Sequence, residues 1–113
     1  MRIYIAGPMR GYPDNNAKAF DDAHRYLEWS RCGIEGMLVK PEILNPMQMA
    51  REEGDDLQNQ NPTKEECKKF FLRDMQAIAS CDAIYMLKGW EKSIGARAEH
   101  AAAVWLQLDI FYQ

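Results

Sequence analysis

The sequence predicts an α/β domain, with a parallel sheet of about four to five strands flanked by helices in a small Rossmann-like (flavodoxin-like) arrangement. Short β-branched or aromatic segments alternate with segments of helical periodicity, and parallel neighbours need such helical crossovers. The segment 83–87 is continuously apolar, which is typical of a strand buried on both faces of a parallel sheet. With 113 residues, 47% of them hydrophobic, the chain has room for one core, so residues 1–113 are expected to form a single domain.

The N-terminal elements are bounded by glycine and proline. Residues 2–6 read Arg-Ile-Tyr-Ile-Ala, and we expect a strand that ends at the Gly-Pro pair behind it. The loop 7–13 contains two glycines and two prolines and cannot be regular structure. Asp14 or Asn15 is then placed to cap a helix whose apolar residues recur at helical spacing: Ala19, Phe20, Ala23, Tyr26 and Leu27.

The middle of the chain is less regular. A second strand is expected over 36–44, interrupted by Pro41. Residues 45–62 are polar, acidic and rich in Asn and Gln, so we expect a long loop with a helical turn near 47–53. Loops of this length are usually functional or mobile. This one is our candidate for the segment that closes over a ligand, within a subunit or across an interface.

The C-terminal half returns to a regular alternation. Thr63 and Glu66 form a capping box, which opens a helix running toward residue 80. After the strand at 83–87 comes a glycine-containing loop, then a helix over 96–106 and a closing strand over 108–112. Right-handed crossovers place both glycine loops at the carboxyl ends of strands, where open α/β sheets bind ligands.

Composition excludes several classes of function. The 14 basic and 17 acidic residues give a net charge of −3, so a strong grip on a nucleic acid polymer is not expected. The longest apolar run, 101–106, is far below the roughly 20 residues of a membrane span, and the N-terminal apolar stretch is too short for a signal peptide. Cys32, Cys67 and Cys81 form no CxxC pair, which indicates a reducing cytoplasm and neither disulfides nor a metal site.

Glu99 is the first candidate for chemistry. We expect it in the first turn of the last helix, on the face that carries Ala102, Ala103 and Leu106. The helix dipole keeps a carboxylate ionised there even when it is partly desolvated, and such a group can attack a sugar carbon. The alternative is that Glu99 only favours the start of the helix, as acidic residues do.

Asp74 falls near the centre of an apolar helical stripe, between 70–71 and 77–78. Burial raises the pKa of an aspartate, which suits a general acid or a hydrogen-bonding clamp; the alternative is a structural cap for a later helix start. In a straight helix from Thr63, Asp74 would lie roughly 16 Å along the axis, away from the ligand end. A catalytic Asp74 therefore requires the helix to break, to tilt across the sheet or to restart near Arg73.

The loop after the first strand is a candidate for phosphate binding. Its exposed N–H groups, the following helix N-terminus and Arg10 could cradle a phosphate, although the pattern is neither GxGxxG nor a P-loop. Ser93 can offer a hydroxyl to an anion or cap its helix. Tyr4 can reach the same end of the sheet or serve as a core aromatic. The candidate substrate-binding residues are Gly7, Pro8, Met9, Arg10, Gly11, Ser93 and Gly95.

The remaining chemically interesting side chains have simpler interpretations. His24 and His100 lack a partner pattern and are expected to be solvated or structural, and Asp82 opens its strand at the end opposite the site. The three tryptophans, Trp29, Trp90 and Trp105, are expected to pack, although Trp90 could instead stack on a base.

Three motifs can be read together: 3–8 (Ile-Tyr-Ile-Ala-Gly-Pro), Asp74 with Asp82 eight residues on, and 93–99 (Ser-Ile-Gly-Ala-Arg-Ala-Glu). This set resembles the nucleoside 2-deoxyribosyltransferase superfamily. Within it, the loop 7–11 and the Ser-x-Gly-x-x-x-Glu spacing look most like the 2′-deoxynucleoside 5′-phosphate N-hydrolases and a group of short transferase-like domains common in phage and bacterial genomes. The resemblance covers both ends of the chain and leaves residues 30–62 unmatched.

The resemblance implies a role for each matching residue. Glu99 would attack the anomeric carbon and form a glycosyl-enzyme intermediate. Asp74 would contact the sugar or help to protonate the base, and Tyr4 would orient the glutamate. A 5′-phosphate would be held by Arg10 and Ser93.

The expected function is cleavage of the N-glycosidic bond of a nucleotide, a 2′-deoxynucleoside 5′-monophosphate, with water or a second base accepting the sugar. The two carboxylates would divide the work as in retaining glycosidases, and no metal or organic cofactor is implied. The alternatives are a catalytically inactive nucleotide-binding or sensing module and an NAD-glycohydrolase-like enzyme. Arg97 departs from the resembled pattern, which often has a small residue there, and it could crowd or neutralise Glu99.

A homodimer or higher homo-oligomer is also expected. A domain this small has little surface with which to enclose a nucleotide. Its helices present more large apolar groups than one small sheet is sure to cover: Trp29, Phe70, Phe71 and Trp105. A two-fold dimer in which each subunit helps to close its neighbour's pocket accounts for both features, and the resembled superfamily implies the same.

Overall fold

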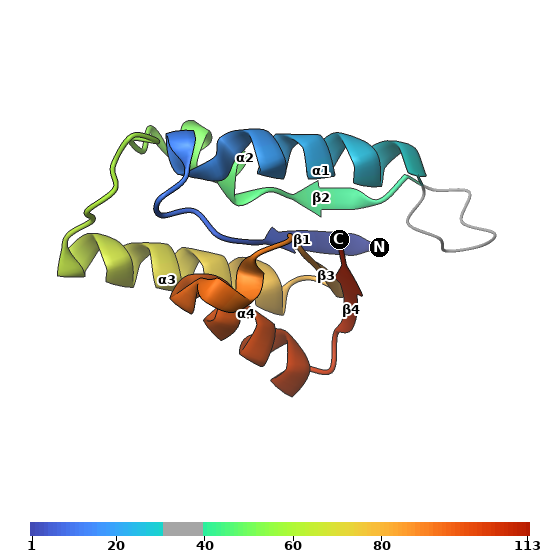
Figure 1. Ribbon diagram of the computed structural model, residues 1–113. Helices are drawn as coiled ribbons and strands as arrows, with labels where there is room; N and C mark the ends of the chain where they lie inside the picture. Colours follow the sequence, from blue (N-terminus) through green and yellow to red (C-terminus); the bar gives the residue numbers. More distant parts are fainter. Residues whose placement is uncertain (31–39) are drawn as a thin grey trace.

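A computed structural model describes residues 1–30 and 40–113 (Figure 1). Within them, four parallel strands form one sheet in the order β2-β1-β3-β4: β1 (Arg2–Ala6), β2 (Glu42–Leu44), β3 (Ala83–Met86) and β4 (Asp109–Tyr112). The helices that flank it are α1 (Ala17–Ser30), α2 (Pro46–Glu53), α3 (Lys64–Ala79) and α4 (Ile94–Trp105). The predicted fold class, a small Rossmann-like α/β domain, is confirmed.

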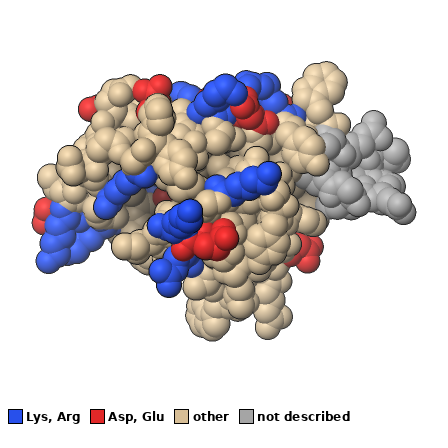
Figure 2. Space-filling view, in the orientation of Figure 1, with Lys and Arg blue, Asp and Glu red and all other residues tan. Residues whose placement is uncertain are grey.

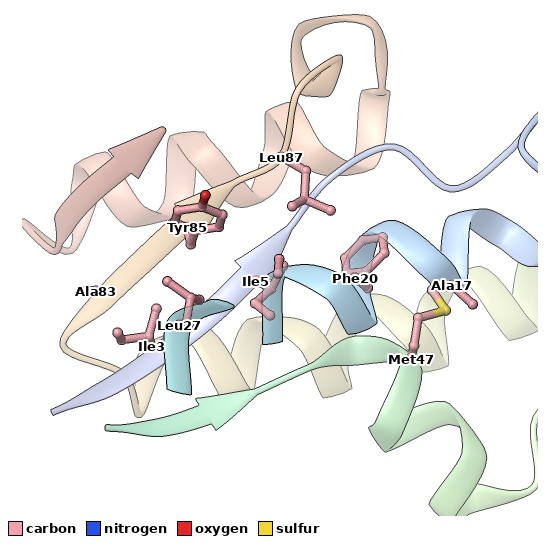
Figure 3. Close-up of a cluster of buried hydrophobic side chains, with 10 residues drawn as sticks. Ile3, Ile5, Ala17, Phe20, Leu27, Met47, Ala83, Tyr85 and Leu87 are labelled. Carbon is pink, nitrogen blue, oxygen red and sulfur yellow. The ribbon is translucent and has the colours of Figure 1, made fainter. Parts of the chain in front are cut away.

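The two faces of the sheet are covered by different helices. Helices α1 and α2 lie on one side, and α3 and α4 on the other (Figure 1). Because side chains alternate along a strand, Ile3 and Ile5 of β1 point to the α1 side, where Figure 3 shows them against Phe20 and Leu27. Tyr4 points to the opposite side and packs in a second cluster with residues of α3 and α4.

The strand order creates a natural ligand crevice. From β1 the chain crosses to β2 at one edge, whereas from β3 it crosses to β4 at the other edge. Such sheets bind ligands where the strand order reverses, outside the carboxyl ends of the strands. The switch point lies between β1 and β3, which pair from Ile3–Ala83 to Ala6–Met86. Both glycine loops therefore begin at this point, as predicted.

Several helix boundaries follow from local caps. The capping box of Thr63 is confirmed, with both of its hydrogen bonds present. Within the segment 45–62, the helical turn predicted near 47–53 is present and is longer than predicted: Asn45 accepts a hydrogen bond from the Met47 amide at 2.9 Å, and Gly54 ends α2 with a φ of 76°. A side-chain cap, a proline at the first position and a terminal glycine suffice for a two-turn helix.

Other predicted boundaries need correction. Neither Asp14 nor Asn15 caps a helix; both have left-handed backbone angles in a 3₁₀ turn, and α1 begins at Ala17. The strand predicted over 36–44 is found only as β2, after Pro41, and its part at 36–39 lies outside the described residues. Strands β3 and β4 are each one residue shorter than predicted. In the described part of the chain, no helix is both long and apolar enough to cross a membrane.

Two tryptophans do not pack as predicted. Trp29 and Trp105 are each 84% exposed, because each stands in the last turn of its helix and points away from the sheet. Trp90 stacks on the ring of His100 at a centroid distance of 4.3 Å, and His100 Nε2 lies 2.8 Å from the Tyr112 hydroxyl. Trp90 thus has a protein partner, and His100 has the structural role that was expected. Asp82 also serves the fold, since its carboxylate accepts a hydrogen bond from the Arg2 amide at 2.8 Å.

Candidate functional site

Two of the predicted catalytic side chains meet beside the sheet. Tyr4 of β1 is fully buried, Glu99 of α4 is 6% exposed, and the Tyr4 hydroxyl donates a hydrogen bond to the Glu99 carboxylate. Burial and the nearby charge of Asp74 raise the pKa of Glu99 to about 8, although the hydrogen bond from Tyr4 opposes the shift. Burial also holds the pKa of Tyr4 well above its ordinary value. Tyr4 therefore stays a neutral donor, fixed on one carboxylate oxygen.

Asp74 joins this pair without any break in its helix. Helix α3 is continuous, so it neither breaks nor restarts near Arg73, and the alternative that Asp74 caps a later helix start is wrong. Helix α3 extends well past the carboxyl end of β1 (Figure 1), and Asp74 stands in the second half of this helix. It lies close enough for its charge to raise the pKa values of both Tyr4 and Glu99. Burial raises the pKa of Asp74 itself to about 6, a shift that the Arg73 guanidinium reduces.

The position of Glu99 differs from the prediction in one respect that matters. Helix α4 begins at Ile94, so Glu99 lies in its second turn, where the helix dipole has faded. Desolvation therefore decides its charge, and the carboxyl group holds its proton at neutral pH. Arg97 is exposed, whereas Glu99 is buried. Two positions along a helix are about 200° apart, so the guanidinium does not crowd or neutralise the carboxylate.

A cavity of about 150 Å³ opens beside Asp74. Its lining residues come from the segment between β1 and α1, from α2, from the loop after α2 and from α3. Residues 55–59, from the segment predicted to close over a ligand, form one wall within the same subunit. The lining residues are Met9, Asn15, Pro46, Met47, Ala50, Asp55, Asp56, Leu57, Asn59, Glu66, Lys69, Phe70, Arg73 and Asp74.

Side-chain amides fasten this wall to the loop before α1. Asn15 Nδ2 donates to the carbonyls of Leu57 at 2.8 Å and Asn59 at 3.1 Å. Gln60 accepts from the Gly11 amide at 2.8 Å and donates to Asn15 at 2.9 Å. In this loop, three successive non-glycine residues, 14–16, have positive φ. Asp and Asn tolerate this strained conformation better than other side chains. Such clustered strain is typical of functional loops.

Sequence reasoning gave Arg73 no role, yet it borders the site. Its guanidinium contacts Glu53 and Asp55 at 2.7 Å each and lies 3.5 Å from Asp74. The sequence signal that could have indicated Arg73 is its position next to Asp74, with which it forms an adjacent pair of opposite charges. What the sequence does not display is that the carboxylates at 53 and 55 converge on this helix.

The predicted phosphate-binding residues are only partly available. A Cβ at Gly7 would lie 2.7 Å from Leu87, so this glycine is required by packing. The Gly11 amide is already bonded to a side chain. Ser93 caps α4 by accepting from the Ala96 amide at 3.2 Å. Pro8 is buried and Met9 is half-buried, whereas Arg10 is exposed, with Nη2 3.3 Å from the sulfur of Cys67. Arg10 therefore remains the one charged group of this predicted set that can reach a ligand.

Within residues 1–30 and 40–113, no three His, Cys, Asp or Glu side chains are grouped so that they could hold a metal ion. The family described as "Domain of unknown function (DUF4406)" matches the chain over residues 1–112. No curated protein matches it.

Proposed function

This chain belongs to the DUF4406 family, and we propose that it cleaves the N-glycosidic bond of a nucleotide, specifically a 2′-deoxynucleoside 5′-monophosphate. The observation that carries the proposal is the cluster of buried Tyr4 and Glu99 with Asp74, which is 16% exposed, at the ligand end of the sheet. Burying two carboxyl groups is costly, and groups with such perturbed pKa values are concentrated at catalytic sites. The resemblance to nucleoside 2-deoxyribosyltransferases gives the same three residues their roles.

The reaction that these groups support proceeds in two steps. A carboxylate oxygen of Glu99 forms a bond to the anomeric carbon while the bond from that carbon to the base nitrogen breaks. The bonding electron pair leaves with the base, which takes a proton from Asp74. Water then attacks the anomeric carbon, gives a proton to Asp74 and releases the Glu99 carboxylate, as in retaining glycosidases. A second base in place of water would give transfer.

The pKa values of the two carboxyl groups predict how the reaction rate depends on pH. The pKa of Glu99 is about 8 and that of Asp74 about 6, so between these values the pair holds one proton, mostly on Glu99. The reactive form, with Glu99 ionised and Asp74 protonated, is a minor one that is most populated between pH 6 and 8. We therefore expect a bell-shaped profile of kcat/KM with limbs near these two values.

The test is the release of free base from a panel of 2′-deoxynucleoside 5′-monophosphates, the matching nucleosides, ribonucleotides and NAD, followed by chromatography. We expect release from the deoxynucleotides and a loss of at least about 10³-fold in Glu99→Gln. The exposed Glu91→Gln serves as control and should retain full turnover. Absence of release from every compound would reject the enzyme, and wild-type turnover of Glu99→Gln would reject the nucleophile. Release from NAD alone would favour the glycohydrolase.

Arg10 gives a separate test of the phosphate. It is exposed at the start of the loop that borders the cavity. A charge-assisted contact to phosphate is worth about 1.5–3 kcal/mol, so Arg10→Ala should weaken binding of 5′-monophosphates roughly 10- to 150-fold and leave nucleosides unaffected. Equal weakening of both would remove the phosphate from the proposal. Arg25→Ala, an exposed arginine on α1, is the matched control.

One observation favours a nucleotide-binding module without turnover. Asp74 lines the cavity, but Glu99 and Tyr4 do not, and Glu99 is protonated in the resting protein at neutral pH. A sensing module would bind nucleotides in calorimetry and release no base from any of them. Binding that is abolished by Asp74→Asn but insensitive to Glu99→Gln would support this alternative.

The chain is proposed to act as a homodimer or higher homo-oligomer. The cavity is smaller than the roughly 300–1,000 Å³ of most ligand pockets. Figure 2 shows an uncharged area over the lower part of the molecule, where the second half of α4 lies. Large apolar side chains on α3 and α4 are exposed by 54–86%: Phe71, Leu72, Ile94, Val104 and Trp105. Patches of this kind mark interaction surfaces.

Light scattering tests the assembly. We expect a mass near twice the 13.1 kDa of one chain, or a higher multiple. Trp105→Lys should shift it to the monomer, whereas Trp29→Lys, equally exposed on α1 at the other side of the sheet, should not. A wild-type mass near 13 kDa that nucleotide does not change would reject the shared-site arrangement.

A further inference from the structure

Arg73 lines the cavity beside Asp74. Its Nη1 donates to Glu53 and Asp55 at 2.7 Å each, and its Nε lies 3.5 Å from an oxygen of Asp74. The side chain is only 16% exposed, and its guanidinium lies 5.2 Å from the centre of the Phe70 ring. One cation therefore joins Asp74 to the end of α2 and to the loop that follows it.

We propose that Arg73 is a positioning residue that fixes both the orientation and the charge of Asp74, with Glu53 and Asp55 holding the guanidinium in place. The inference rests on the proposed function, in which Asp74 gives a proton to the leaving base and takes one back from water. A group with that task must be able to both lose and regain its proton near neutral pH.

The surroundings of Asp74 explain why it needs this cation. The titratable groups around it come from five segments: Tyr4 of β1, Glu53 of α2, Asp55 of the loop, Arg73 of α3 itself and Glu99 of α4. Burial raises the pKa of Asp74, and the charges of Glu53 and Asp55 raise it further. Arg73 acts in the opposite sense, through its charge and its hydrogen bond.

Removing the guanidinium would change both the charge and the orientation of Asp74. An opposite charge at this range typically lowers the pKa of a carboxyl group by one to three pH units, so Asp74 would hold its proton through neutral pH without Arg73. Glu53 and Asp55 would keep only Lys69 as a shared partner, at 4.0 and 3.6 Å, and the anchor between α2 and α3 would be weakened. The carboxyl group would then be free to rotate away from the leaving base.

The experiment compares three variants of the full chain. Arg73→Gln removes the charge, and Arg73→Lys keeps the charge but not the planar fork. Arg51→Gln is the control, because Arg51 pairs with Asp21 through two bonds, 3.1 and 2.8 Å, elsewhere in the fold. The titration of Asp74 is followed by NMR of ¹³C-labelled carboxyl groups, with Asp74→Asn identifying the signal. The pH profile of base release is measured in parallel.

We expect the midpoint of the Asp74 titration to rise by one to three pH units in Arg73→Gln, with the acidic limb of the pH profile rising with it up to the pKa of Glu99, about 8. Arg73→Lys should restore most of the midpoint but not kcat, since the orientation is lost. Arg51→Gln should change neither. An unchanged midpoint in Arg73→Gln would overturn the proposal, as would a lower rate with an unmoved acidic limb, which is the signature of a merely structural role.

The NMR readout separates this proposal from the proposed function. If the wild type releases no base, the function fails, and the midpoint of Asp74 still decides whether Arg73 sets its charge. If Arg73→Gln does not fold, Arg73→Lys carries the test: a lower kcat supports the inference, and an unchanged kcat overturns it.

Discussion

The side chains on the two faces of β1 are equally buried, but they differ in chemistry. On the α1 side, Ile3 and Ile5 pack against Phe20 in a hydrophobic cluster that contains no carboxyl group. On the other side, Tyr4 is just as buried and yet contacts the carboxyl group of Glu99. Apolar burial stabilises a fold at about 25 cal/mol per Å², whereas carboxyl burial costs stability. The first face therefore accounts for the fold, and the second is retained at a cost to it, as functional sites commonly are.

The largest effect is expected on the apolar face. Phe20 is fully buried between α1 and the sheet (Figure 3), so Phe20→Ala should lower the free energy of unfolding by about 3–5 kcal/mol. Urea denaturation at fixed pH measures it. The titration midpoints of the carboxyl groups on the other face should not move. A loss below about 1 kcal/mol would show that this face is not the main source of stability.

Glu99→Gln, on the face of β1 that carries Tyr4 (the polar face), should stabilise the protein. The folded-state pKa of Glu99, about 8, exceeds its ordinary 4.5, so between these pH values the folded chain holds more protons than the unfolded chain, and stability falls as pH rises. Glu99→Gln removes this dependence. At pH 8 it should exceed the wild type by on the order of a few kcal/mol, and at pH 4.5 the difference should nearly vanish.

Thermal or urea unfolding of Glu99→Gln across this pH range gives the answer. The exposed Glu91→Gln is the control and should follow the wild type at every pH. Equal destabilisation of Glu99→Gln at both ends of the range would mean that the carboxyl group supports the fold, and the contrast between the two faces would be lost.

Tyr4→Phe tests how the polar face tunes its nucleophile. The hydrogen bond from Tyr4 favours the ionised form of Glu99, and a bond to a charged group is worth about 1.5–3 kcal/mol. Its removal should raise the pKa of Glu99, and with it the basic limb of the pH profile, by roughly one to two pH units. Tyr26→Phe, exposed on α1, should leave the limb in place. A fixed limb in Tyr4→Phe would deny the hydroxyl its orienting role.

The smallest effects on stability are expected at two glycines, Gly7 and Gly95, which the sequence alone does not distinguish. Gly7→Ala forces a Cβ to within 2.7 Å of Leu87 on the apolar face and should cost about 1–3 kcal/mol. Gly95, in the first turn of α4, has open space around a Cβ, so Gly95→Ala should stabilise by about 0.5–1 kcal/mol. Chemical denaturation of both variants checks the signs. Equal effects would mean that the two faces constrain their loops alike.

Local physics was enough to predict most of the fold. The strand at 2–6, the capping box at Thr63 and the alternation that implies a parallel sheet depend on dihedral preferences and hydrogen bonds within a few residues. The same rules underestimated α2, where they predicted only a helical turn near 47–53 inside a long loop. Asn45, Pro46 and Gly54 each favour the bounds of a helix, and only their sum turns a polar segment into α2.

The sequence by itself also determined which side chains could carry chemistry, because Tyr4, Asp74 and Glu99 stand out by type and by position. Only the tertiary structure decided that they meet: Tyr4 and Glu99 are 95 residues apart, and Asp74 of α3 lies close enough for its charge to raise the pKa values of both. It also decided their charges and the role of Arg73. Desolvation and Coulomb energies depend on distances in space, and those distances exist only once α2, α3 and α4 are packed around β1.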